Sequence, residues 1–228
     1  MKEMTEFNLT DALERARAFV EMGGPAMAAI AALSVVTVAL ILWKIWRLAA
    51  CGAWSGGSHS AAAIALWTRG AHQAAIDSLT RRRSLRARLV RAAMVAAADP
   101  ALTDEDAEAE TARVARALLA RAQAGLRGLE LAATIGPLLG LLGTVTGMIS
   151  AFQALQEAGS HADPATLAGG IWEALLTTAA GMAVAIPAQV ALTWFESVLD
   201  RLRHDLEDAA TRVFVARHSA RATCKAAE

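Results

Sequence analysis

Three long apolar runs alternate with charged segments along this chain of 228 residues. They cover positions 24–43, 131–155 and 167–195; the first two carry no charge and the third carries only Glu173. A bilayer core about 30 Å thick is crossed by about 20 helical residues. A helix of a soluble bundle would show a polar face within such a run. The pattern therefore predicts an all-α integral membrane protein with three transmembrane helices and long cytoplasmic helical extensions.

The expected organisation has seven segments. They are a periplasmic amphipathic N-terminal segment (1–23), transmembrane helix 1 (24–46), a cytoplasmic helical loop (47–129), transmembrane helix 2 (130–155), a short periplasmic loop (156–166), transmembrane helix 3 (167–195), and a cytoplasmic C-terminal helix and tail (196–228). At the end of the first run, Trp43 and Trp46 resemble an aromatic belt, and we expect Lys44 and Arg47 to extend their charges toward the interface.

Basic residues predict the orientation. Positions 45–130 hold twelve arginines, and the tail after 196 holds five arginines and Lys225. The loop 156–166 holds no Lys or Arg, and the first 21 residues hold three basic and five acidic side chains. Because cytoplasmic loops carry the excess of Lys and Arg, we expect the N-terminus and the loop 156–166 outside and the large loop and the C-terminus in the cytoplasm.

Helix signals also occur between and beyond the apolar runs. Positions 8–22 read as an amphipathic helix, and Ala-rich helices are expected over 60–78 and 84–98, the second ended by Asp99-Pro100. Thr103 followed by Asp106 predicts a helix start. No helix breaker follows before Gly125, and the pattern leads into the second span, so we expect a long helix there. The tail repeats apolar residues at helical spacing, at Leu199, Leu202, Leu206, Ala210 and Val213.

The composition argues against several classes of function. The net charge is zero, and the basic run 81–91 contains no aromatic residue, so contact with anionic lipid explains it better than nucleic acid does. Cys51 and Cys224 lie too far apart for a paired motif. The five histidines are scattered without ligand spacing. We therefore expect no metal, no cofactor, no nucleic-acid partner and no enzymatic activity.

Glu173 is the most informative candidate, because a carboxylate inside a span costs roughly 2.5–3.5 kcal/mol on insertion scales. It should face protein or water, where burial would favour its neutral form and suit it to proton uptake and release. Thr177 follows one turn later, on nearly the same face, and Thr178 flanks it. The alternative is a structural acid, either hydrogen-bonded or close enough to the interface to reach water.

Both later runs carry a stripe of small residues at three- and four-residue steps. In the second run these are Gly136, Gly140, Gly143, Gly147 and Ala151, and in the third they are Gly170, Ala174, Thr177, Gly181, Ala185 and Ala188. Such stripes let helix backbones approach closely in lipid. The hydroxyls of Thr144 and Thr146 add a polar side, and Pro137 and Pro187 free backbone carbonyls within the spans.

Two segments carry a family resemblance. GPLLGLLGTVTGMISAF (136–152) resembles the second-span signature of the MotA/TolQ/ExbB proton-channel family, and GGIWEALLTTAAGMAVAIPA (169–188) resembles its third-span signature. FVEMGGPAMAAIAALSVV (19–36) is similar to the start of ExbB-like first spans. The resemblance covers all three spans in order, whereas the cytoplasmic loop and tail match only in character. The stretch QVALTWFE after Pro187 departs from the family pattern and leaves the subtype open.

The resemblance implies roles for particular residues. Glu173 matches the family glutamate beside the proton path, Thr178 and Thr144 match its polar lining, and Pro137 and Pro187 match its prolines. It further implies a pentamer around an ExbD- or TolR-like single-span partner that carries an essential aspartate, with output to a TonB- or TolA-like protein that spans the periplasm. The implied function is a proton-driven motor subunit that energises envelope transport. A MotA-type stator relative and a non-conducting membrane scaffold are the alternatives.

Overall fold

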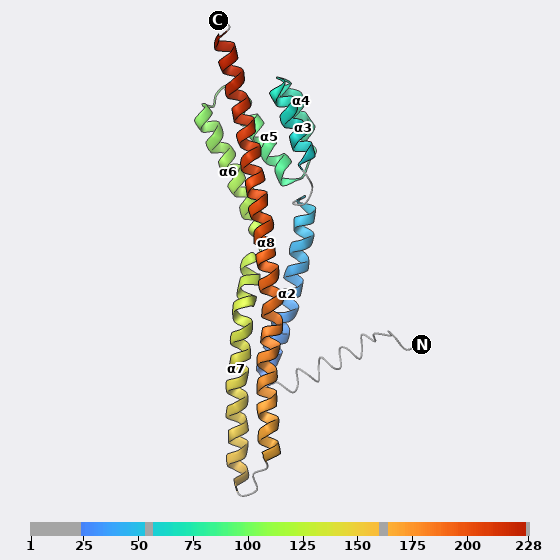
Figure 1. Cartoon of the computed structure of the whole chain (residues 1–228), viewed down its shortest axis with the longest axis vertical. Coiled ribbons are helices and arrows are strands. Elements are labelled where there is room, and N and C mark those ends of the chain that lie inside the picture. Colours follow the sequence, from blue (N-terminus) through green and yellow to red (C-terminus); the bar gives the residue numbers. More distant parts are fainter. Residues whose placement is uncertain (1–23, 53–56, 160–163, 227–228) are drawn as a thin grey trace, which may run out of the picture. The chain divides into compact units, whose positions relative to one another are not determined.

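The computed structural model describes residues 24–52, 57–159 and 164–226. The described residues form seven helices and no strand, which confirms the all-α prediction. The helices are α2 (Gly24–Ala50), α3 (Ser58–Thr68), α4 (His72–Leu79), α5 (Leu85–Ala98), α6 (Asp104–Gln123), α7 (Leu126–Ala158) and α8 (Pro164–Ala226) (Figure 1). The predicted N-terminal amphipathic helix at 8–22 lies outside the described residues.

Three helical stretches are long and apolar enough to cross a membrane, within Gly24–Ala50, Asp104–Ala158 and Leu167–His218. They contain the three predicted spans, so the prediction of three potential transmembrane helices is confirmed. Pro137 lies inside α7 and Pro187 inside α8, and both helices continue past their proline.

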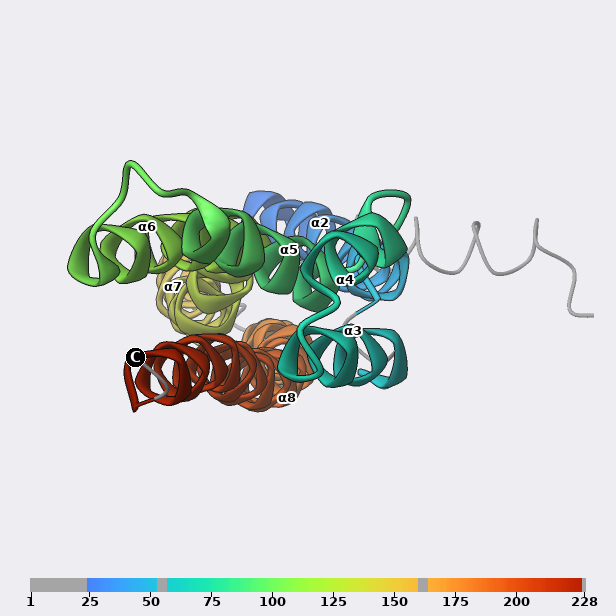
Figure 2. The same cartoon turned by 90° about the horizontal axis from the view of Figure 1, so that it is seen from above.

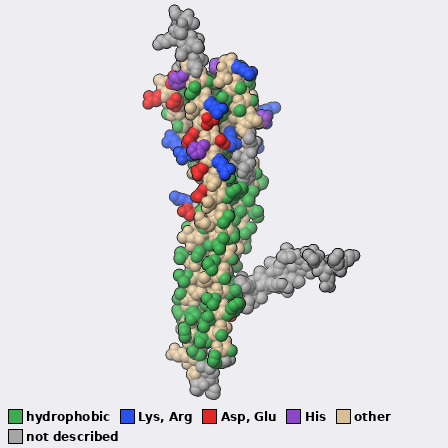
Figure 3. All heavy atoms as spheres, viewed as in Figure 1, with side chains coloured by type: hydrophobic (Ala, Val, Ile, Leu, Met, Phe, Trp, Pro, Cys, Tyr) green, Lys and Arg blue, Asp and Glu red, His purple; other side chains and the backbone are tan. Residues whose placement is uncertain are grey.

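The chain forms two compact units, which we name by their surfaces. The apolar unit comprises the described residues up to Leu42 together with Leu126–Leu192, and the charged unit comprises Trp43–Gly125 with the described residues from Thr193 onward. Large apolar side chains lie exposed on the apolar unit, whereas Lys, Arg, Asp and Glu side chains gather on the charged unit (Figure 3). An exposed apolar surface of this extent suits lipid rather than water.

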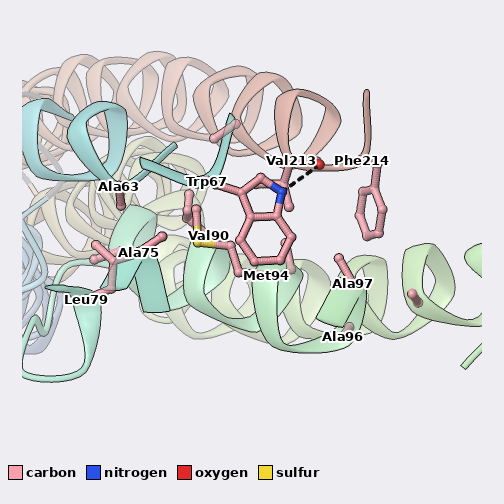
Figure 4. Packing of buried hydrophobic residues seen from close by; sticks show 14 residues of the cluster. Ala63, Trp67, Ala75, Leu79, Val90, Met94, Ala96, Ala97, Val213 and Phe214 are labelled. Atoms are coloured by element: carbon pink, nitrogen blue, oxygen red, sulfur yellow. Dashed lines mark hydrogen bonds between the residues drawn. The ribbon is translucent and has the colours of Figure 1, made fainter. Parts of the chain in front are cut away.

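The charged unit has a core of its own. Figure 2 shows α3, α4, α5 and α6 gathered beside the C-terminal part of α8. Trp67 is 3% exposed and packs among the buried residues of this cluster, including Met94 and Val213 (Figure 4), and its indole Nε1 donates to the Val213 carbonyl at 3.2 Å. Arg86 of α5 forms an ion pair with Asp205 of α8.

Several sequence predictions hold in this unit. The hydroxyl of Thr103 accepts from the backbone N–H of Asp106 at 3.1 Å, so Thr103 caps α6 as predicted. α5 ends at Ala98, immediately before Asp99-Pro100. α8 extends without interruption from the third span into the tail. Leu199, Leu202, Leu206 and Val213 lie on its buried side, while Ala210 is half-buried.

Two expected helices are interrupted. The helix expected over 60–78 is divided into α3 and α4 at Gly70, whose φ of 84° favours glycine. The helix expected to run from Thr103 into the second span ends at Gln123, and Gly125 adopts φ 91° before α7 begins. A Cβ on Gly125 would lie 2.6 Å from the ring of Trp43. Packing of this tryptophan therefore adds a second requirement for glycine at the break.

Candidate functional site

The candidate site lies in the apolar unit, where α7 and α8 run antiparallel and side by side (Figure 1). Glycines set their distance. A Cβ on Gly181 would lie 2.5 Å from the carbonyl oxygen of Gly136, and a Cβ on Gly140 would lie 2.9 Å from the Cα of Thr178. A Cβ on Gly147 would lie 3.0 Å from the Cβ of Ala174. The predicted stripes of small residues therefore meet each other along one seam.

The N-terminal part of α2 joins this pair along α7. A Cβ on Gly143 would meet the side chain of Thr177 and, at 3.3 Å, the Cβ of Ala26. Farther along, a Cβ on Gly128 would lie 2.9 Å from a methyl carbon of Leu40. The later residue of α2 thus contacts the earlier residue of α7, so these two helices are antiparallel too. The three spans pack against one another through small residues of α7.

Two threonines of α8 converge on one backbone carbonyl of α7. The Thr178 hydroxyl donates to the Gly140 oxygen at 3.0 Å. The Thr177 hydroxyl is 2% exposed and lies 2.7 Å from the Ala174 oxygen and 3.4 Å from the Gly140 oxygen. Hydrogen bonds between helices are available here because the glycine at 140 lets α8 reach the α7 backbone.

Thr144 belongs to the same neighbourhood. In an α-helix the N–H of residue i points to the carbonyl of residue i−4, so the Gly140 oxygen that accepts from Thr178 is also the one directed at the Thr144 amide. Thr144 is half-buried, and its own hydroxyl donates to the Leu141 oxygen at 2.7 Å. The Gly140 carbonyl thus faces the hydroxyls of Thr177 and Thr178 and the backbone amide of Thr144. We call these three residues the threonine cluster.

Glu173 does not join the threonine cluster within one chain. It is exposed, while its neighbour Ala174 is buried at 2% against α7. Five residues separate Glu173 from Thr178, which places the two side chains about 140° apart around an α-helix. Glu173 and Thr177 lie four residues, or about 40° around the helix, apart, but only Thr177 is buried in the seam and the glutamate flanks it. The proton-path role of Glu173 stays a prediction.

The sequence did not reveal the role of Lys44. We expected its ammonium group to extend toward the interface, but Lys44 is 1% exposed and its Nζ donates to the carbonyls of Ala122 and Ala124 at 2.6 and 2.8 Å. Arg47, also on α2, donates to the Arg121 oxygen at 2.8 Å. The last carbonyls of a helix lack intrahelical donors and carry partial negative charge. The two cations of α2 therefore cap the C-terminus of α6.

The arrangement defines a class: an α-helical membrane protein whose spans meet along glycines, with hydroxyls gathered inside the seam. Comparison of the sequence with known protein families identifies the family. The MotA/TolQ/ExbB proton channel family model matches residues 79–208, more than half of the chain. The chain belongs to this family, which makes it a member of a group of inner-membrane transport proteins.

Curated relatives agree with the family match. The chain is 41% identical over 87 residues to the biopolymer transport protein exbB1 of Vibrio cholerae, covering 36% of this chain and 38% of that protein. It is 57% identical over 60 residues to a putative ExbB-like biopolymer transport protein of Synechocystis, covering 25% and 24%. The Tol-Pal system protein TolQ of Pseudomonas aeruginosa is 43% identical over 72 residues, covering 30% and 31%. The chain thus spans well under half the length of each of these relatives.

Proposed function

We propose that this protein is an ExbB/TolQ-like subunit of an inner-membrane motor driven by the proton gradient. In this proposal it works with an ExbD/TolR-like single-span partner and energises envelope transport through a TonB/TolA-like protein. The N-terminus is periplasmic and the C-terminus cytoplasmic, in keeping with the arginines of the charged unit. The family match and the ExbB- and TolQ-named relatives support this assignment.

One observation carries the proposal: the hydroxyls of Thr177 and Thr178 meet at the Gly140 carbonyl, one turn from Thr144, and the threonine cluster contains no carboxylate. Hydroxyls relay or solvate a proton but do not hold it at physiological pH. A proton path along this seam needs an acid from another chain, and an aspartate on the partner's single span would supply it. Glu173, exposed on the flank of α8, is then available to an adjoining copy in a pentamer.

The energy available is adequate for a motor. One elementary charge that crosses 100 mV releases about 2.3 kcal/mol. Moving a two-state equilibrium from 1:99 to 99:1 requires about 5.5 kcal/mol. Two or three protons per step would therefore reverse the populations of two arrangements of the assembly.

The test compares two threonines of the same helix. Thr144→Val should reduce proton-gradient-dependent transport in cells on the order of tenfold or more, equivalent to about 1.4 kcal/mol in a barrier. Thr146→Val is the matched control, because both hydroxyls donate to carbonyls of α7 but Thr146 is exposed, whereas Thr144 is half-buried and one turn from Gly140. Transport is measured with the partner genes present, and assembly is checked by size-exclusion chromatography.

A second pair of variants tests the acid. Glu173→Gln should impair transport, whereas Glu157→Gln, at the exposed end of α7, should not. Normal transport by both Thr144→Val and Glu173→Gln would favour the non-conducting scaffold. The internal hydrogen bonds of Thr144 and Thr177 are compatible with that alternative. Rotation of a flagellar-type motor by this chain would instead favour the MotA-type stator.

A further inference from the structure

A hollow lined by arginines lies in the charged unit and takes no part in the proposed proton path. It encloses about 660 Å³ between the end of α2, the α4–α5 turn, α5 and α6. Its five cationic lining residues are Arg47, Arg82, Arg83, Arg88 and Arg91. We call this hollow the arginine pocket, and we propose that it binds the phosphate of an anionic phospholipid headgroup.

The charge of the pocket selects an anion. None of the residues that line it is Asp or Glu, so no carboxylate within the lining competes for the guanidinium groups. Arg82, Arg83, Arg88 and Arg91 are exposed residues whose side chains reach the pocket from two elements. A guanidinium group offers a planar set of N–H donors that matches two phosphate oxygens at once.

Arg47 is held in place at the rim. Its guanidinium lies 4.9 Å from the centre of the Trp43 ring and donates to the Arg121 carbonyl. A cation over an aromatic face is stabilised by the charge distribution of the ring. One cationic side of the pocket is therefore preorganised, which lowers the entropy lost when an anion binds.

The rest of the lining favours a lipid over a free anion. Leu79, Val114 and Leu118 supply apolar surface beside the arginines. Inorganic phosphate would gain nothing from that surface, whereas the glycerol backbone and upper acyl carbons of a lipid would bury apolar area there. The pocket thus combines the two surfaces that a phospholipid presents at its headgroup.

The position of the pocket along α2 fits the same ligand. Trp46 lines the pocket and is 71% exposed. It lies three residues beyond the apolar run 24–43 on the same continuous helix. Tryptophan is enriched at the level of the headgroups, where one edge of the ring is apolar and the other is hydrated. A phosphate at this level belongs most simply to a membrane lipid.

Calorimetric titration of the full-length protein in an uncharged detergent tests the proposal. The probes are dioctanoyl phosphatidylglycerol, dioctanoyl phosphatidylcholine, inorganic phosphate and a short single-stranded oligonucleotide. The variant is Arg82→Gln/Arg83→Gln/Arg88→Gln. The control, Arg69→Gln/Arg81→Gln/Arg116→Gln, removes the same charge from positions that do not line the pocket, and Arg81 directly precedes Arg82.

Phosphatidylglycerol should bind the native protein saturably and more tightly than phosphatidylcholine. Each cation near an anionic headgroup raises the affinity roughly fivefold. The pocket variant lacks three of them, so it should bind phosphatidylglycerol on the order of a hundredfold more weakly. The control variant should stay near the native affinity. If the triple variant does not fold, Arg88→Gln is compared with Arg81→Gln, and about a fivefold difference is expected.

Four outcomes would overturn the proposal. The first is equal affinity for the two lipids, and the second is an equal loss of phosphatidylglycerol affinity in the control variant. The third is phosphate binding as tight as phosphatidylglycerol binding, and the fourth is oligonucleotide binding tighter than phosphatidylglycerol binding. The third outcome would identify a free-anion site, and the fourth a nucleic-acid surface. The measurement involves no proton movement, so its result is independent of the proposed motor function.

Discussion

The two units of the chain differ in the side chains through which their helices pack. In the apolar unit the contact is made by glycines and alanines, and the large apolar residues Leu138, Leu141 and Ile186 are more than half exposed. In the charged unit the buried cluster combines alanines with large residues such as Trp67 and Met94, and most of the charges lie outside.

The difference follows from the solvent. In water, burial of apolar area stabilises a core by about 25 cal/mol per Å², so a tryptophan at the centre is favourable. In lipid that gain disappears, because acyl chains are as apolar as leucine, and close backbone contact with interhelical hydrogen bonds remains. Glycines therefore set the helix contacts of the apolar unit, whereas the charged unit adds large apolar residues to its alanines.

The largest expected effect is in the charged unit. Trp67→Ala removes a ring that is 3% exposed and its hydrogen bond to Val213, and should lower the free energy of unfolding by about 3–5 kcal/mol. Trp172→Ala is the control, because Trp172 is 68% exposed. Hydrogen exchange should rise in peptides from α3 to α5. An equally small effect of both variants would show that the cluster does not stabilise this unit.

An intermediate effect is expected where a side chain is added to the seam. Gly181→Ala places a Cβ 2.5 Å from the Gly136 oxygen, and overpacking of this kind costs about 1–3 kcal/mol. Gly169→Ala adds the same methyl group on the same helix with no neighbouring atom within 4 Å. Denaturant titration in detergent measures both. The seam would lose its structural importance if the two alanines had the same effect.

The smallest expected effect isolates a single hydroxyl in each unit. Thr178→Val loses the bond to the Gly140 oxygen on another helix and should cost about 0.6 kcal/mol. Thr111→Val removes a hydroxyl that donates to Ala107 on its own helix, so an apolar group of the same shape should be nearly neutral. The same titration compares them. A larger loss for Thr111→Val would reverse the inferred difference between the units.

The sequence predicted the features that depend on local chemistry. The three spans followed from the length of the apolar runs, the start of α6 from Thr103 and Asp106, and the end of α5 from Asp99-Pro100. The stripes of small residues predicted the faces on which α7 and α8 meet. Each of these depends on residues within a few turns of one another, so a single segment carries the signal.

Features that depend on distant segments were not predictable. The acceptors of Lys44 lie 78 and 80 residues along the chain, so an interfacial lysine and a buried helix cap look the same in sequence. The breaks at Gly70 and Gly125 depend on a positive φ, which the residue type permits but does not require. Helical spacing places Glu173 near the face of Thr177. Only the contacts of α8 with α7 show that Thr177 is buried in the seam and that Glu173 is exposed beside it.

The approach of Gly181 to Gly136 has a consequence for the nature of the seam. The site of a missing Cβ on Gly181, 2.5 Å from the Gly136 carbonyl oxygen, is filled by the second α-hydrogen of glycine. That direction is the geometry of weak Cα–H···O contacts, which contribute about 0.5–1 kcal/mol each. Two residues without side chains thereby form a directional polar link between spans, which any other residue type would abolish.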